Sequence, residues 1–394
     1  MVGAEADVVD VLVSNDFPPR IGGSHHWMYE VYRRWPGDVV VLASKDDEID
    51  SESFDTRSHG SLTIRRETPV FRNLDFLDAP YRKSLWFQVQ ALRNLRHSGT
   101  TRIHCLRAFP EGLPGAIVRR LYPRETKLVC YAHGEEILVA HSSRQLAMMA
   151  KAVYGASDLV IANSENTRKL VCEISPAAKV VCVHPGVSME QYSVSSKQAQ
   201  ETRARWGWPE GTIVVATISR MEPRKNQSAV IGAVATLRRE GLPIAYVCAG
   251  DGEEKARLER EAWDLGLRDW VVFPGTVSDA EKILIFSAAD IHAMPSVQRG
   301  PMIEGFGIVF IEAAAAGTPS IAGKIGGQPE AVLDGETGLV VDGDDQSSVE
   351  AALRTLASDA GLRERMAGKA KTWAADHDWH RVLTKTRTEL ERAL

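Results

Sequence analysis

The chain has 394 residues, of which 44% are hydrophobic and 25% are charged, and its formal net charge is −5. This length favours two domains, the composition is ordinary for a globular protein, and the negative net charge argues against nucleic acid as the main partner. Five scattered cysteines lack the spacing of a metal site or a disulfide framework. With no signal-peptide pattern and no apolar run near the ~20 residues of a membrane span, we expect a soluble, cytoplasmic protein.

Short β-branched runs alternate with helical patterns in the first half of the chain. The expected strands are Val8–Ser14, Val39–Ala43, Ile103–Leu106, Leu128–Ala132, Leu159–Asn163 and Val180–His184. The expected helices are Ser24–Trp35, Tyr81–His97, Pro114–Leu121, Arg144–Gly155 and Ser164–Glu173. This rhythm is typical of a doubly wound parallel sheet.

A second series of the same kind follows a polar stretch, which predicts a linker near residues 186–210. Its expected strands are Ile213–Ile218, Ala245–Ala249, Val271–Phe273, Ile291–Met294, Ser320–Ala322 and Leu339–Val341. The end of the chain, Arg363–Leu394, has a helical pattern that is broken at residues 377–379.

The first expected strand runs into a loop that ends in Gly22-Gly23, where a helix begins. Paired glycines let a ligand approach the backbone and offer N–H groups to a phosphate. The loop also contains Arg20 and Ile21, and it lacks the Gly-x-Gly-x-x-Gly pattern of dinucleotide sites. An ordinary strand-to-helix loop is the alternative.

Two further strand ends carry reactive side chains. His133 follows an expected strand, at the edge where ligands bind in parallel sheets, although a structural histidine is the alternative. Arg220 and Lys225 flank a proline turn after the first strand of the second series. Both cations suit one diphosphate, and a solvated basic loop is the alternative.

The stretch from Glu304 to Glu312 reads as a Gly-Phe-Gly turn that enters an alanine-rich helix. A helix entrance attracts phosphate, whereas the two flanking carboxylates suit sugar hydroxyls. Together they predict a nucleotide-sugar site. The alternative is a tight loop and a buried helix with two solvated acids.

Other strand ends suit a nucleobase, but not a metal ion. Gly250, Asp251 and Val277 lie in loops that could form a slot for the base, or could simply be turns. The Asp-x-Asp pairs at 342/344 and 376/378 are too short to define metal sites, and we expect none.

The region Arg57–Lys127 contains 14 Lys and Arg residues against 5 Asp and Glu. Its helix Tyr81–His97 has apolar residues at helical spacing, which favours a helix that faces the core. A basic amphipathic helix at an anionic membrane is the alternative, which would place the protein at the inner face of the plasma membrane.

These motifs together resemble the retaining glycosyltransferases of family 4, whose architecture is termed GT-B. The similarity runs through Gly22-Gly23, His133–Glu135, Asp158–Ser164, His184–Val187, Arg220–Lys225, Glu304–Glu312, Gly326–Val332 and Asp334–Leu339. It covers nearly the whole chain and looks most similar to the phosphatidylinositol mannoside mannosyltransferases.

The resemblance implies an α/β protein with two Rossmann-like, doubly wound domains that face an interdomain cleft. Residues 1–190 would bind the acceptor and residues 191–376 the nucleotide-sugar donor. Residues 377–394 would form a helix that crosses back to the first domain.

The resemblance also implies roles for the site residues. His133 would lie beside the anomeric carbon, Arg220 and Lys225 would neutralise the leaving diphosphate, and Glu304 would hold the donor sugar. The remaining donor-binding residues are Gly22, Gly23, Gly250, Asp251, Val277, Gly305, Phe306, Gly307, Ile308, Val309 and, at the ribose, Glu312.

We therefore expect a metal-independent, retaining transferase that moves a hexose, with mannose favoured, from a nucleoside diphosphate to an acceptor hydroxyl. No cofactor is expected, because the GDP- or UDP-linked sugar is itself a substrate. The acceptor stays open among a lipid, a polyprenyl-linked glycan and a small aglycone. The alternatives are a nucleotide-sugar epimerase of similar fold and a non-catalytic nucleotide-sugar-binding protein.

Overall fold

The computed structural model describes residues 8–19, 22–45, 50–57, 59–69, 78–96 and 100–394. Two parts of the sequence predictions lie outside the described residues: Arg20 and Ile21 of the first loop, and residues 58, 70–77 and 97–99 of the basic region Arg57–Lys127. The chain divides into a first unit, Met1–Pro185 with Trp379–Leu394, and a second unit, Gly186–Asp378. The divisions predicted from the sequence fall after residues 190 and 376.

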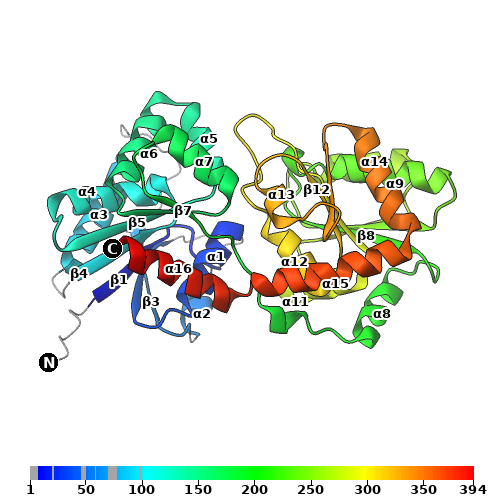
Figure 1. Cartoon of the computed structure of the whole chain (residues 1–394), viewed down its shortest axis with the longest axis horizontal. Coiled ribbons are helices and arrows are strands. Elements are labelled where there is room, and N and C mark those ends of the chain that lie inside the picture. The colour runs from blue at the N-terminus through cyan, green and yellow to red at the C-terminus, as the bar shows by residue number, and fades with distance from the viewer. Residues whose placement is uncertain (1–7, 20–21, 46–49, 58, 70–77, 97–99) are drawn as a thin grey trace. The chain divides into compact units, whose positions relative to one another are not determined.

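The first unit contains a seven-stranded parallel sheet in the order β3-β2-β1-β4-β5-β6-β7 (Figure 1). Its strands are β1 (Val8–Val13), β2 (Val39–Lys45), β3 (Leu62–Pro69), β4 (Thr100–Cys105), β5 (Thr126–Ala132), β6 (Leu159–Ala162) and β7 (Val180–Cys182). Its helices are α1 (Gly23–Tyr32), α2 (Glu52–Asp55), α3 (Ala79–Leu95), η2 (Ala108–Gly112), α4 (Leu113–Leu121), α5 (Glu135–His141), α6 (Arg144–Ala156), α7 (Glu165–Ile174) and α16 (Trp379–Ala393).

The last helix, α16, belongs to the first unit although it ends the chain. Its first residue, Trp379, is buried, and the Trp379 ring meets the His26 ring of α1 edge-on, with ring centroids 5.8 Å apart. The predicted return of the C-terminal helix to the first domain is confirmed.

The second unit contains a six-stranded parallel sheet in the order β10-β9-β8-β11-β12-β13. Its strands are β8 (Ile213–Ile218), β9 (Ile244–Ala249), β10 (Val271–Gly275), β11 (Ile291–Met294), β12 (Ser320–Gly323) and β13 (Gly338–Val341). Its helices are η3 (Met189–Tyr192), α8 (Ser196–Arg205), η4 (Pro223–Lys225), α9 (Gln227–Arg239), α10 (Lys255–Asp264), α11 (Asp279–Ala288), α12 (Ile308–Ala316), α13 (Gln328–Ala331), α14 (Gln346–Ser358) and α15 (Ala360–Asp376).

The segment predicted as a linker, 186–210, differs from that expectation because it contains secondary structure. Helix α8 begins at a capping box in which Ser195 and Gln198 bind each other's backbone N–H groups. The helix then packs on α11 of the second unit. Its polar composition reflects one exposed face rather than an extended connection.

The strand orders place the candidate sites within each unit. The strands are parallel, but the side of the sheet on which successive strands are added changes between β1 and β4 in the first unit, and between β8 and β11 in the second. In open parallel sheets, ligands bind outside the carboxyl ends of the strands at such a reversal. The loops after these four strands are therefore the first places to look for function.

Candidate active site

The loop after β8 forms a tight turn whose cations point into the second unit. It passes through η4 to Asn226, which adopts a left-handed conformation (φ 59°) and starts α9. The Asn226 side-chain amide donates to the backbone oxygens of Pro295 (3.2 Å) and Gly343 (2.7 Å). These bonds fix the end of the turn, and therefore the direction of Arg224 and Lys225.

Arg224 and Lys225 converge on one carboxylate oxygen. Arg224 Nη1 lies 3.1 Å from Glu304 Oε2, and Lys225 Nζ forms an ion pair with the same oxygen. Burial raises the pKa of Glu304, but the charges of Lys225 and Arg224 outweigh it and hold that pKa below its usual value. Burial and Arg224 lower the pKa of Lys225, whereas Glu304 opposes them. The carboxylate is thus ionised and firmly held.

The charges around this turn leave a positive excess. Glu222 binds Arg224 Nε at 3.0 Å and Arg220 Nη1 at 2.7 Å. Among these five described side chains, three cations share two carboxylates, a net charge of +1 that suits an anionic ligand. The structure places Arg220 and Lys225 on different acids, and the Arg220 side chain is 63% exposed.

The entrance of α12 lies directly after Glu304. Gly307 precedes the helix in a left-handed conformation (φ 89°), and a Cβ at this position would lie 2.5 Å from the Phe310 ring. Gly307 offers no side chain to cap the first N–H groups of the helix. Gly305, Phe306, Ile308 and Val309 complete the turn, so backbone N–H groups and the positive end of the helix dipole adjoin the cationic turn.

Glu312 lies further along α12 and is held by Lys282 of α11. Lys282 Nζ is 2.6 Å from Glu312 Oε1 and 3.0 Å from Asp279 Oδ1. Although burial lowers the pKa of Lys282, these two carboxylates outweigh it and raise that pKa. The side chains of Glu304 and Glu312 are only 12% and 8% exposed, so the alternative of two solvated acids is wrong.

The loops predicted to form a base slot are neighbours at the carboxyl ends of β9 and β10. Gly250 N donates to Gly275 O at 2.7 Å, which joins the two strand ends. The Asp251 carboxylate is 60% exposed and lies 3.5 Å from Lys255 Nζ. Val277 is half-buried against the core of the unit. The Ser278 side chain caps α11 after this loop.

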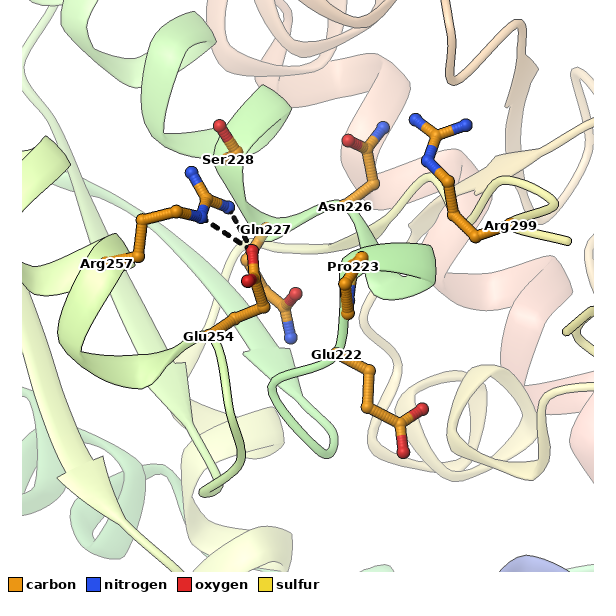
Figure 2. Close-up of a pocket in the computed structure, with 8 residues that line it drawn as sticks. All are labelled: Glu222, Pro223, Asn226, Gln227, Ser228, Glu254, Arg257 and Arg299. Carbon is orange, nitrogen blue, oxygen red and sulfur yellow. Dashed lines mark hydrogen bonds and ion pairs between the residues drawn. The ribbon is translucent and has the colours of Figure 1, made fainter.

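A pocket of about 250 Å³ opens beside the cationic turn (Figure 2). It is lined by Glu222, Pro223, Asn226, Gln227, Ser228, Glu254, Arg257 and Arg299. Its two arginines are already paired with acids, Arg257 with Glu254 and Arg299 with Asp344. Its volume is below the ~300 Å³ typical of small-molecule sites, so the pocket does not suit a whole nucleotide sugar.

In the first unit, α1 begins at the predicted glycine pair. Gly22 precedes the helix without a side-chain cap, and the space around a Cβ at Gly23 is open. The loop before these glycines is braced by Arg66, which donates to the carbonyls of Phe17 and Pro18 and forms a two-bonded ion pair with Asp55. These contacts fix the backbone at residues 17 and 18.

His133 follows β5 and is neutral at physiological pH. Burial and the charge of Arg107 lower its pKa to about 3. Its Nε2 lies 2.7 Å from the Leu106 carbonyl, which can only accept, so Nε2 carries the proton. The neutral ring therefore presents Nδ1 as a hydrogen-bond acceptor, and the ring packs edge-on against Trp27.

Glu111 lies next to the loop after β1, and its burial should make the stability of the protein depend on pH. It is fully buried, accepts from Asn15 N at 3.3 Å, and its Oε2 is 3.6 Å from Arg107 Nε. Burial raises its pKa to about 7 despite Arg107. Because this folded pKa exceeds the unfolded value of about 4.5, its stabilising contribution is complete below pH 4.5 and lost by about pH 7.

We expect Glu111→Gln to remove this pH dependence, because the amide never ionises. Relative to the parent protein, the variant should gain about 3 kcal/mol of unfolding free energy between pH 4.5 and pH 8. Urea unfolding at both values measures the difference. A difference that is the same at both values would contradict the buried-acid interpretation.

Two residues of this site, Arg224 and Lys282, were not predicted from the sequence. Arg224 stands beside Lys225 in the Pro-Arg-Lys turn, and two adjacent cations before a helix were the available signal. Lys282 lies one turn after Asp279, a spacing that brings side chains together on a helix. Its contact with Glu312 joins two different helices, so no pattern in the local sequence indicates it.

Sequence profiles of two glycosyltransferase families match successive parts of this chain. "Glycosyltransferase Family 4" matches residues 21–191, and "Glycosyl transferases group 1" matches residues 198–373. The chain belongs to the family 4 glycosyltransferases, which are enzymes of the GT-B fold. It transfers a sugar from a nucleotide sugar.

The GDP-mannose-dependent alpha-(1-6)-phosphatidylinositol monomannoside mannosyltransferase of Mycolicibacterium smegmatis is 30% identical over 383 residues, which cover 93% of this chain and 94% of that one. Anabaena HepE in complex with UDP and glucose has a TM-score of 0.79 at 21% identity, covering 97% of this chain and 99% of that chain. Sucrose-phosphate synthase from Thermosynechococcus elongatus has a TM-score of 0.80 at 20% identity, covering 98% and 99%. These two structures share the fold.

Proposed function

We propose that this enzyme transfers mannose from GDP-mannose to a hydroxyl of a phosphoinositide-type glycolipid. The second unit would hold the donor and the first unit the acceptor. The observation that carries the proposal is the charge of the turn beside the α12 entrance, where the three cations Arg220, Arg224 and Lys225 are paired with two acids, Glu222 and Glu304. The Mycolicibacterium relative, whose name specifies GDP-mannose and phosphatidylinositol monomannoside, supports the choice of substrates.

Charge stabilisation would supply most of the catalysis. As the bond to the anomeric carbon breaks, negative charge grows on the diphosphate, and Lys225, Arg220 and the N–H groups after Gly307 would stabilise it. These cations would neutralise the diphosphate in place of a divalent metal, which supports a metal-independent reaction. Turnover should therefore survive EDTA, and a loss that Mg²⁺ restores would contradict this part.

The reaction would retain the configuration of the anomeric carbon. The acceptor hydroxyl would attack from the side of the leaving group, and the departing phosphate would take its proton. A double displacement instead requires a free carboxylate nucleophile, and the two cations on Glu304 make that carboxylate a poor one. NMR of the early product tests this point, since an inverted linkage would exclude it.

Neutral His133 would serve the reacting sugar as a hydrogen-bond acceptor. Its Nδ1 can accept from a sugar hydroxyl, while the bond from Nε2 to Leu106 fixes the ring. Such a group orients the sugar without adding charge beside the anomeric carbon. Gly22 and Gly23 would leave room for the donor at the entrance of α1.

The donor and acceptor are tested together in one assay. Transfer is measured from GDP-mannose and from UDP-glucose to phosphatidylinositol monomannoside in mixed micelles. We expect transfer of mannose from GDP-mannose and no transfer of glucose from UDP-glucose. Transfer from UDP-glucose without any from GDP-mannose would overturn the proposed donor, and activity on a polyprenyl-linked glycan or a soluble aglycone alone would overturn the proposed acceptor.

A lipid acceptor requires contact with a membrane surface, and α3 offers a suitable face. Trp86 is 64% exposed on this helix, beside the exposed Arg82 and Lys83. Helix α3 packs on α4, whose end exposes Leu121 to 58% next to Arg120. Exposed apolar residues between cations are typical of helices that lie on anionic membranes. None of the helices that the structure describes has the length and hydropathy to cross a bilayer.

We expect the double variant Arg82→Glu/Lys83→Glu to bind vesicles of phosphatidylserine and phosphatidylcholine at least ten-fold more weakly, since each basic residue contributes about 1 kcal/mol. Trp86→Ser should weaken binding further by removing the apolar contact. Co-sedimentation at fixed salt measures both effects. The matched control is Trp263→Ser, because Trp263 is 59% exposed on α10 of the other unit. Equal binding by all variants would exclude this face.

A further inference from the structure

Gln328, the first residue of α13, has a buried side-chain amide that is fully hydrogen-bonded. Its Oε1 accepts from the backbone N–H groups of Ser296 (3.1 Å) and Gly323 (2.8 Å). Its Nε2 donates to the carbonyls of Ser296 (2.9 Å) and Ile325 (2.8 Å). Turning the amide over would set donor against donor and acceptor against acceptor, so these four bonds fix its orientation.

Ser296 belongs to the segment that supports the cationic turn. The next residue, Val297, donates its N–H to the carbonyl of Arg224 at 2.8 Å. The preceding residue, Pro295, accepts from the side chain of Asn226 at 3.2 Å. Whatever holds Ser296 therefore also holds the turn that carries Arg224 and Lys225.

The residue before Gln328 supports the other half of the ion pair. Gly327 donates its N–H to the Glu304 carbonyl at 3.0 Å. The backbones approach so closely here that a Cβ on Gly327 would lie 2.0 Å from the Gly305 carbonyl oxygen. A shift of α13 would therefore also move the backbone of Glu304 and Gly305.

We propose that Gln328 is a positioning residue for sugar transfer. By binding Ser296 and carrying Gly327, it fixes the distance between the cationic turn and the Glu304 loop, and so keeps Lys225 and Glu304 aligned for the donor. This inference rests on the proposed function, in which these two residues act on the donor. Gln328 itself acts only through them.

The test replaces Gln328 by methionine, which has a similar length but none of the four hydrogen bonds. We expect kcat to fall about 10- to 100-fold, since small misplacements of reacting groups have effects of this size, with a smaller change in the donor KM. The matched control is Thr318→Val. Thr318 is buried and donates to the Phe286 carbonyl at 2.7 Å, at the amino end of β12.

Thr318→Val should lower the melting temperature while leaving kcat within about two-fold. Unchanged kcat in Gln328→Met would overturn the inference. It would also be overturned if Thr318→Val and Gln328→Met lowered the melting temperature equally and lost kcat equally. If Gln328→Met does not fold, Gln328→Glu replaces it in the same comparison, because it keeps both accepting contacts and loses the donated ones.

A double variant separates positioning from a general loss of structure. If Gln328 acts through Glu304, adding Gln328→Met to Glu304→Gln should cause little further loss, because the effects of residues that act as a unit do not multiply. Losses that multiply would overturn the inference. Full activity of Glu304→Gln alone would instead contradict the proposed function, which keeps the two failures distinct.

Discussion

Replacing Lys225 by alanine should lower the turnover number about 100- to 1,000-fold, the range seen when one group that stabilises developing charge is removed from an active site. Lys225 is buried beside Glu304, so solvent cannot replace its charge on the departing diphosphate. The fold should persist, because Arg224 Nη1 stays 3.1 Å from Glu304 Oε2 and keeps that carboxylate paired. Steady-state kinetics with GDP-mannose measure the loss.

The control for this variant is Lys324→Ala. Lys324 also pairs with a carboxylate, Asp342 at 2.7 Å, but it is 54% exposed. Its removal should leave turnover within about two-fold, because exposed ion pairs contribute little. Near-normal turnover in Lys225→Ala, with an unchanged melting temperature, would remove Lys225 from the mechanism.

Much of the fold could be predicted from the sequence, because buried parallel strands leave a strong local signal. All twelve expected strands are present, and they are mostly buried runs such as Val8–Val13 and Ile244–Ala249. The missed strand, β3, lies at the edge of its sheet and contains Arg65, Arg66 and Glu67, so its composition does not indicate a buried strand. Charged composition rather than edge position explains this miss, because the edge strands β7, β10 and β13 contain apolar runs and were predicted.

Individual residues of the candidate site could be predicted from their motifs, but the contacts between motifs could not. Lys225 and Glu304 were each expected at a donor site, and the structure brings them together across 79 residues of sequence. That Arg220 shares a diphosphate with Lys225 stays a prediction, and in this structure Arg220 pairs with Glu222, two residues away. Gln328 lies in the Gly326–Val332 motif, but its role left no signal, because its partners are backbone groups of loops that only the folded sheet places side by side.

Removing the Glu304 carboxylate should separate sugar transfer from nucleotide binding. In Glu304→Ala, the hydroxyls of the donor sugar lose their acceptor, so we expect transfer to fall at least 100-fold, as for other groups that orient a reacting substrate. Free GDP should bind as well as before or more tightly. Arg224 keeps Glu222, but Lys225 loses its carboxylate, and a buried unpaired cation favours an incoming diphosphate.

Isothermal titration with GDP and transfer kinetics with GDP-mannose test this separation in the same preparation. Glu304→Gln is the companion variant, because it keeps a group that can bond to hydroxyls while removing the charge. It should retain more transfer than Glu304→Ala. Glu336→Ala is the control, since Glu336 is a 58% exposed acid paired with Lys369. Equal losses of GDP affinity and of transfer in Glu304→Ala would mean that this carboxylate acts only by holding the cations that bind the diphosphate. That result would contradict its assignment to the sugar.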